Sequence, residues 1–328
     1  MIACVRCLSW IAIAFLVLAI GEPACAQNKL KWAHVYEVTE PFHTQALWAA
    51  DKIKKRSDGR FDIEVFPASQ LGNEKQLNEG LSLGIVDIAY VGVNFAAETY
   101  RPLGITGAPF MLRDFEHWKA YRASKLFSEL AAGYEDKTRH KIVGLVYYGL
   151  RHVTANKPIR TPEDMKGMRL RVPPASLVRM FTQSVGAEAI PIAFTQVYTA
   201  LQQGLVDGQE NPLPTIVTKK FYQVQSHVVL TRHITESMMT VIGGHVWSKL
   251  TDDDRKLFAD TLVEAAANAT AAVVASEQML AGELKGLGIT VVEPDREAFR
   301  RAAIPLHNDR SAGAGWTREQ YDELQALK

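Results

Sequence analysis

Cysteine is almost absent from this chain of 328 residues, and its three cysteines all lie within the first 25 positions. This N-terminal segment has the pattern of a secretory signal peptide: Arg6, then an apolar run from Trp10 to Ile20, then the small residues of Ala24–Ala26. Because the apolar run is shorter than the roughly 20 residues that span a bilayer, we expect export and cleavage near Ala26, with residues 1–26 removed. The mature chain then has no thiol, which excludes disulfides, thiolate metal sites and cysteine nucleophiles.

An excess of charge and the common catalytic motifs are also missing. The formal net charge is +1, so we expect no nucleic-acid partner, which would need a concentrated basic surface. The sequence has no G-x-x-x-x-G-K-[ST] loop, no H-E-x-x-H, no G-x-S-x-G and no G-x-G-x-x-G after a strand. Its nine histidines show no recognisable metal-ligand spacing. We therefore expect no metal, no cofactor and no enzymatic turnover.

Strand and helix patterns alternate along the roughly 300 remaining residues, a length sufficient for two domains. Residues 29–36 and 60–66 alternate apolar and polar side chains as strands do, and residues 43–58 between them have helical spacing. Asn73 is expected to cap a helix that ends at Gly84, since glycine adopts a left-handed backbone at little cost. This alternation predicts an α/β fold.

Two segments of the chain share one pattern. In LSLGIVDIA (81–89) and LQQGLVDGQ (201–209), leucine, glycine, valine and aspartate occur in the same order and spacing. Each follows a proline-alanine-serine sequence, at 67–69 and 174–176. Two lobes of similar build would explain the repeat, although junctions from helix through glycine to strand also resemble one another for purely local reasons.

A long segment after Thr251 contains no helix breaker until about Leu284. Thr251 and Asp254 form a capping pattern at its start. At 1.5 Å per residue, such a helix is on the order of 50 Å long. It either braces two lobes or lies along the surface of one.

Arginine at the end of a predicted strand is the clearest indication of binding chemistry. In RLRVPPAS, Arg169 and Arg171 share one face of a strand that Pro173 ends, and Ser176 is expected to cap the following helix. Ligands of open α/β sheets collect at the carboxyl ends of strands. A guanidinium there suits a carboxylate, because it donates two parallel hydrogen bonds. Arg171 is therefore predicted to bind an acid, with a structural salt bridge as the alternative.

Two further polar side chains are expected at strand ends. Arg151 follows a strand-like run and a glycine, although this pattern alone fits a solvated arginine equally well. Asn211 would bring an amide to the end of the strand near residue 208. Its neighbours Asp207, Gln209 and Glu210 are expected to hold the loop in shape.

Four motifs in order resemble the periplasmic solute receptors of tripartite ATP-independent periplasmic (TRAP) transporters, the DctP type. They are FPASQLGNEKQLNEGLSLGIVDIAYVG, GLRHVTANKPI, LRVPPAS and PIAFTQVYTALQQGLVDGQENP. The resemblance implies a two-lobed periplasmic-binding-protein fold with a hinge and a long helix spanning both lobes. It implies that the protein captures an organic acid in the periplasm and delivers it to a membrane permease; we expect a monomer. The implied lobes are 27–148 with about 237–276, and 149–236 with about 277–328.

The resemblance also implies roles for individual residues. Arg171 would form a paired salt bridge with the ligand carboxylate, supported by Arg151 and Asn211 and walled by Phe194. The other lobe would contribute Tyr90 and Asn94, which belong to or follow its own copy of the repeat. Asn73 and Glu74 open a helix there and would read ligand hydroxyls. His34 is a candidate for an additional positive charge. The candidate ligand-binding residues are therefore Arg171, Arg151, Asn211, Phe194, Asn94, Tyr90, Glu74, Asn73 and His34.

The identity of the acid stays open at this level. No motif places a second cation against a distal carboxylate, although His34, Arg101 or Arg232 would carry one if they reached the site. The stretch AYVGVNFAAE lacks charges suited to sialic acid. A sugar acid, a hydroxy acid and a C4-dicarboxylate all remain candidates. The alternative function is an exported hydrolase of carboxylated substrates, with Ser176, His34 and Glu74 as its candidate catalytic residues.

Overall fold

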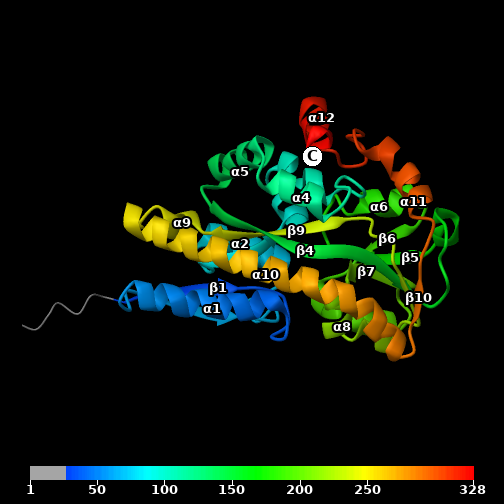
Figure 1. The fold of residues 1–328 in the computed structure, drawn as a ribbon, viewed down its shortest axis with the longest axis horizontal. Helices are drawn as coiled ribbons and strands as arrows, with labels where there is room; N and C mark the ends of the chain where they lie inside the picture. The colour runs from blue at the N-terminus through cyan, green and yellow to red at the C-terminus, as the bar shows by residue number, and fades with distance from the viewer. Residues whose placement is uncertain (1–26) are drawn as a thin grey trace, which may run out of the picture.

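The computed structural model describes residues 27–328 and shows a mixed sheet flanked by helices (Figure 1). The predicted signal peptide, its cleavage point and all three cysteines lie outside the described residues. The strand order is β2-β1-β3-β9-β4-β7-β5-β6, and β8 joins β10 to β4. The strands are β1 (Asn28–Ala33), β2 (Phe61–Phe66), β3 (Ile88–Gly92), β4 (Lys141–Ala155), β5 (Arg169–Val172), β6 (Glu188–Pro191), β7 (Gly208–Pro212), β8 (His227–Val229), β9 (Thr235–Ile242) and β10 (Thr290–Val292).

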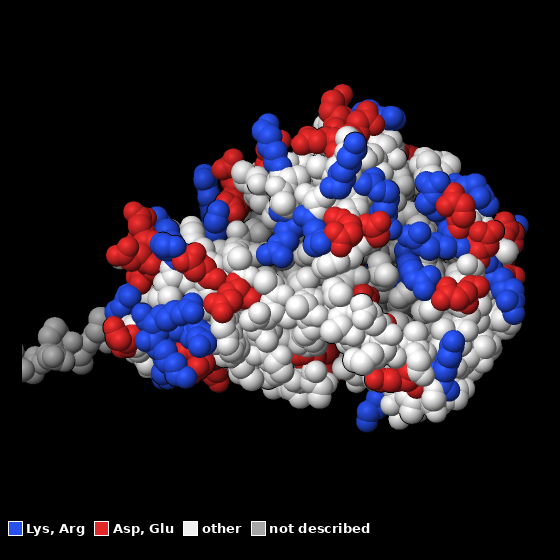
Figure 2. Space-filling model, viewed as in Figure 1, with Lys and Arg blue, Asp and Glu red and all other residues white. Residues whose placement is uncertain are grey.

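Helices cover both faces of the sheet, so the predicted α/β class is confirmed (Figure 1). On the face seen in Figure 2, acidic and basic side chains are interspersed, and the middle of the surface is largely uncharged. The α-helices are α1 (Pro41–Arg56), α2 (Glu74–Leu83), α3 (Val93–Ala96), α4 (Phe115–Arg122), α5 (Lys125–Thr138), α6 (Arg179–Ser184), α7 (Val197–Gln202), α8 (Leu213–Thr218), α9 (Gly244–Trp247), α10 (Asp252–Gly286), α11 (Arg296–Ala303) and α12 (Arg318–Ala326).

Strand β4 belongs to both halves of the sheet. Its residues 141–150 pair with β9, beside β1, β2 and β3, whereas its residues 151–155 pair with β7 and β8. The register shifts between Tyr147 and Gly149, close to the point where the partners change. The two halves are therefore connected through one continuous strand, as a two-lobed fold with a hinge requires.

The repeated sequence pattern forms the same local structure in both halves. The glycine of each segment has a left-handed φ, 70° in one and 67° in the other. Asp87 accepts a hydrogen bond from the backbone N–H of Lys31 in β1 at 2.8 Å, and its own N–H donates back to the Lys31 carbonyl at 3.0 Å. Asp207 makes the same reciprocal pair with Arg169 in β5, at 2.8 Å each way. The repeat thus marks equivalent connections in two similarly built halves.

The predicted caps of two helices are confirmed. Asn73 accepts a hydrogen bond from the N–H of Gln76 at the start of α2, which ends at Gly84. Thr251 accepts one from the N–H of Asp254 at the start of α10. Helix α10 packs on α1 and β4 and then continues to α8 and β10, so it spans both halves of the sheet (Figure 1).

One expectation for the second half needs revision. Ser176 does not cap a helix, because α6 starts later, at Arg179; instead its N–H and hydroxyl donate to the carboxylate of Glu98.

The C-terminal helix α12 packs against α5, within residues 27–148, and the carbonyl of Leu324 lies 2.8 Å from a ring nitrogen of His117. The end of the chain therefore contacts the first half of the molecule as well.

We predict that Gly149→Ala lowers the free energy of unfolding by about 2 to 3 kcal/mol. Gly149 has a φ of 123°, and an added Cβ would lie 2.8 Å from Oε1 of Glu277 and 3.0 Å from Cβ of Pro212. Gly204→Ala is the matched control, because its φ of 67° is also positive but no atom lies within 4 Å of the added carbon. It should cost only about 1 kcal/mol. Equal losses in denaturant-unfolding experiments would contradict this account of Gly149.

Candidate functional site

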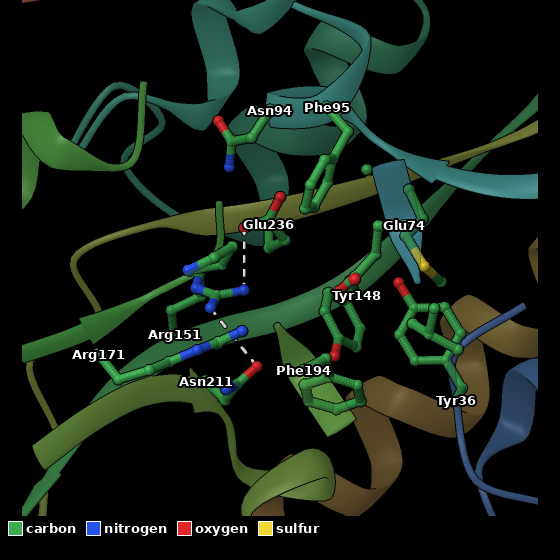
Figure 3. A pocket seen from close by; sticks show the side chains of 14 residues that line it. Tyr36, Glu74, Asn94, Phe95, Tyr148, Arg151, Arg171, Phe194, Asn211 and Glu236 are labelled. Carbon is green, nitrogen blue, oxygen red and sulfur yellow. Dashed lines mark hydrogen bonds and ion pairs between the residues drawn. The ribbon is translucent and has the colours of Figure 1, made fainter. Parts of the chain in front are cut away.

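A cavity lies where the two halves of the sheet meet (Figure 3). The structure brings six of the nine predicted site residues to its walls: Glu74, Asn94, Arg151, Arg171, Phe194 and Asn211. The wall also contains residues that sequence reasoning missed, chiefly Tyr36, Phe95, Tyr148, Glu236 and Met238.

The other three predicted residues do not line this cavity. The hydroxyl of Tyr90 donates to the carbonyl of Phe42 in the core, and the side chain of Asn73 is used as a helix cap. His34 lies 3.2 Å from a ring nitrogen of His43, and burial lowers the pKa of His34 to about 3. It is therefore neutral at neutral pH and cannot supply a second positive charge.

Arg171 is a buried cation with a free hydrogen-bonding nitrogen. It lies near the end of β5 and is 1% exposed, and its Nε donates to the carbonyl of Ile192 at 2.8 Å. Its Nη2 is buried and has no hydrogen-bond partner among the described residues. Burial lowers the pKa of Arg171 to about 10, so the group stays charged at neutral pH. Within residues 27–328 it forms no ion pair, so the alternative of a structural salt bridge is wrong.

Arg151 is fully engaged with acidic residues of neighbouring strands. Its Nε and Nη2 donate to the carboxylate of Glu210 in β7, and Nη1 donates to Glu236 in β9 at 3.2 Å. Nη2 also approaches the amide oxygen of Asn211 at 3.5 Å (Figure 3). Arg151 as a whole is 4% exposed. Arg151 therefore holds three strands together at the cavity wall, while its charge is already compensated.

The two carboxylates that share Arg151 have opposite pKa shifts. Burial opposes ionisation of Glu210, but the charge of Arg151 and hydrogen bonds from His233 and Arg151 outweigh it and lower the pKa of Glu210 to about 2. Burial raises the pKa of Glu236 to about 7, because Arg151 only partly offsets it and the nearby charge of Glu210 adds to it. His233 is itself buried, which lowers its pKa, so it stays neutral at neutral pH. One carboxyl of the site therefore titrates near neutrality.

The buried polar strand β7 keeps its amides in place through a chain of hydrogen bonds. Asn211 donates to Gln209 at 2.6 Å, and Gln209 donates to Thr154 at 3.2 Å. Asp207 pairs with Arg169 at the start of the strand. The expected shaping role of Asp207, Gln209 and Glu210 is thus confirmed.

Polar contacts across the rim join the two halves of the molecule. Lys219 contacts the carboxylate of Glu37 at 2.5 Å and lies 4.8 Å from the ring of Phe194. Thr215 donates to Glu40 at 3.2 Å. These contacts link residues 37–40 with residues 215–219, and the bonds from Ser176 to Glu98 link the halves elsewhere.

Among the wall residues that were not predicted, Glu236 is the one that a sequence pattern could have indicated. Glu236 lies in TESMMTVI, a strand whose residues are all buried. An acidic residue inside such a strand needs a partner, since an unpaired buried charge is costly. Tyr148 lies in the long strand β4 and shares a 2.9 Å hydrogen bond with Thr215.

Comparison with known proteins identifies the family of this chain and agrees with its fold. Residues 32–312 match the model of bacterial extracellular solute-binding protein family 7, DctP. The sialic acid-binding periplasmic protein SiaP of Vibrio cholerae serotype O1 is 33% identical over 310 residues, which cover 93% of this chain and 95% of SiaP. The chain belongs to family 7, and it is therefore a solute-binding protein of the TRAP transporter class.

Solved structures of the same class are similar throughout. A TRAP periplasmic solute-binding protein from Bordetella bronchispeptica, with density assigned to pantoate, is 30% identical with a TM-score of 0.87, covering 92% of this chain and 100% of its own. One from Polaromonas sp. JS666, bound to D-erythronate, is 29% identical with a TM-score of 0.87, covering 92% and 99%. The predicted two-lobed fold with a long helix is confirmed by this similarity.

We predict that Glu236→Gln changes how stability depends on pH. The carboxyl of Glu236 has its pKa raised from 4.5 to about 7 in the folded protein, so its stabilising contribution is fully present below 4.5 and is lost as pH rises through about 7. The variant cannot titrate at this position. Its melting temperature relative to the wild type should therefore be higher at about pH 8 than at about pH 5.

The measurement is thermal unfolding of both proteins at the two pH values without ligand. Glu40, whose pKa burial also raises to about 7, is common to both proteins and cancels in the difference. A difference in melting temperature that does not vary with pH would show that Glu236 does not titrate in this range.

Proposed function

We propose that this protein captures a small organic acid in the periplasm and delivers it to the membrane permease of a TRAP transporter. The candidates are sugar acids, hydroxy acids and C4-dicarboxylates. Export would use the signal peptide predicted at residues 1–26, and the receptor would act as a monomer.

The observation that carries this proposal is the free, buried guanidinium of Arg171. A carboxylate is the complementary group, because its two oxygens accept parallel hydrogen bonds and its charge compensates a cation that is otherwise expensive to bury. The neighbouring amide of Asn211 and the ring of Phe194 supply a polar contact and a flat wall. The relatives solved with D-erythronate and with density assigned to pantoate contain organic acids, which supports the same chemistry here.

Ligand capture is proposed to act through closure of two lobes. In this proposal, lobe I comprises 27–148 with about 237–276, and lobe II comprises 149–236 with about 277–328. Arg171 and Asn94 then reach the cavity from different lobes. A ligand that contacts both stabilises the closed form, because those contacts are available together only when the lobes are closed.

A hydrolase is not supported by the arrangement of the candidate catalytic residues. Ser176 is hydrogen-bonded to Glu98, and neither Ser176 nor His34 lines the cavity that contains Glu74. Members of the family are binding proteins. We therefore propose stoichiometric binding without turnover.

We predict that Arg171→Ala abolishes acid binding while the protein stays folded. Removing one partner of a buried charge pair costs about 2 to 5 kcal/mol, which corresponds to a loss of affinity of about 30-fold to several thousand-fold. Arg169→Ala is the matched control, because Arg169 lies on the same strand but is half-exposed and paired with Asp207.

A thermal-shift screen against organic acids identifies the ligand, since a ligand of the folded state raises the melting temperature. Isothermal titration calorimetry then compares the variants. Unchanged affinity in Arg171→Ala would refute the anchoring role of this residue.

A further inference from the structure

The cavity wall offers one uncompensated cation to a ligand. Its two arginines are Arg151 and Arg171. Arg151 is paired with Glu210 and Glu236, whereas Arg171 has no ion-pair partner within residues 27–328. Of the two arginines in the wall, only Arg171 is therefore left to pair with a ligand, and it can pair with one carboxylate.

In the part of the chain that the structure describes, no second unpaired cation lines the cavity. Lys219, which lies over the ring of Phe194, is held by Glu37 at 2.5 Å. Arg232, a candidate from the sequence, is paired with Glu293 at 3.0 Å and does not line the cavity. Arg101 lies in a separate depression, together with Ser176.

The side chain of Glu74 lies across the cavity from the guanidinium of Arg171 (Figure 3). Glu74 begins α2, and its Oε2 is buried without a hydrogen-bond partner in the described part of the chain. Burial raises the pKa of Glu74 even though the charges of Arg171, Arg151 and Lys219 lower it. In its ionised form, which the three positive charges favour, Glu74 only accepts hydrogen bonds, so this atom then requires a donor.

The remaining groups around Glu74 add no positive charge. Tyr36 and Tyr148 line the same region, and the hydroxyl of Tyr148 is already bonded to Thr215. Glu236 contributes a second carboxyl to the wall. A second ligand carboxylate would bring acceptor atoms and negative charge to a region that already contains both.

We infer that the ligand is a monocarboxylate whose other end carries hydroxyl or ammonium groups, and that Glu74 is the residue that excludes dicarboxylates. A hydroxyl or an ammonium donates the hydrogen bond that Oε2 lacks, whereas a carboxylate cannot and is repelled. This inference rests on the proposed function, because it assumes that Arg171 binds the first carboxylate.

The experiment compares acids that differ only at the end remote from the first carboxylate. Each aldonate of four, five or six carbons is paired with its aldarate, in which a terminal carboxylate replaces the terminal CH₂OH; galactonate with galactarate is one pair. The pair of 4-aminobutanoate and succinate tests an ammonium group. Titration calorimetry uses protein that has been unfolded and refolded to remove bound ligand. At the chain length that fits best, the monocarboxylate should bind about 100-fold more tightly than the diacid.

The variant Glu74→Gln tests the assigned residue, because it removes the negative charge at nearly constant volume and adds a donor. Discrimination should fall to about 10-fold or less, mainly through tighter binding of the diacid. The matched control is Glu79→Gln on the same helix, since Glu79 is exposed and 3.8 Å from Lys75; discrimination should not change. Equal melting temperatures of the two variants without ligand confirm that both are folded.

The outcomes separate this inference from the proposed function. A wild-type protein that binds a diacid as tightly as its matched monocarboxylate overturns the inference, while acid binding through Arg171 stands. Unchanged discrimination in Glu74→Gln overturns the role of Glu74. Binding of none of these acids contradicts the proposed function itself, and the inference falls with it.

Discussion

The central physical constraint on this structure is the burial of two guanidinium groups in one cavity. Like charges in a low-dielectric site repel, and each must be compensated or left for a ligand. Arg151 is compensated internally by Glu210 and Glu236, which tie β4 to β7 and β9. Arg171 is left with a free nitrogen. The first arginine therefore builds the wall, and the second is the proposed anchor for the ligand carboxylate.

Strand β4 explains how such a site lies between two similar halves. It pairs with β9 along residues 141–150 and with β7 and β8 along 151–155, so Arg151 lies where the partners change. The carboxylate of Glu277 on α10 accepts a hydrogen bond from the N–H of Leu150 at 2.6 Å, beside the irregularity at Gly149. The long helix is thus attached to the backbone at this crossing. Motion of the proposed lobes would be expected to involve these same residues.

The polar strand β7 shows how buried amides and carboxyls are tolerated. Every residue of GQENP is buried, and the side chains of Gln209, Glu210 and Asn211 each bond to a neighbour in the wall. Because these side chains have hydrogen-bond partners, the strand presents a rigid polar surface instead of an apolar one. By contrast, the one carboxylate oxygen of the wall that lacks a partner belongs, within residues 27–328, to Glu74. This contrast separates the framework of the wall, whose polar groups are satisfied, from the groups that we propose contact the ligand.

The sequence by itself determined the features that depend on near neighbours. The caps at Asn73 and Thr251 were predictable because each bond spans three residues, and the position of Arg171 followed from strand alternation ended by proline. Of the nine site residues that the family resemblance implied, six line one cavity.

Only the tertiary structure decided which charges are paired. Arg151 donates a hydrogen bond to Glu236, which is 85 positions away in the sequence, because β4 and β9 are neighbours in the sheet. The neutrality of His34 and the contact of Ser176 with Glu98 likewise depend on burial and on partners from distant segments. Pairing and burial are set by the packing of whole elements against one another, and no local pattern in the sequence encodes that packing.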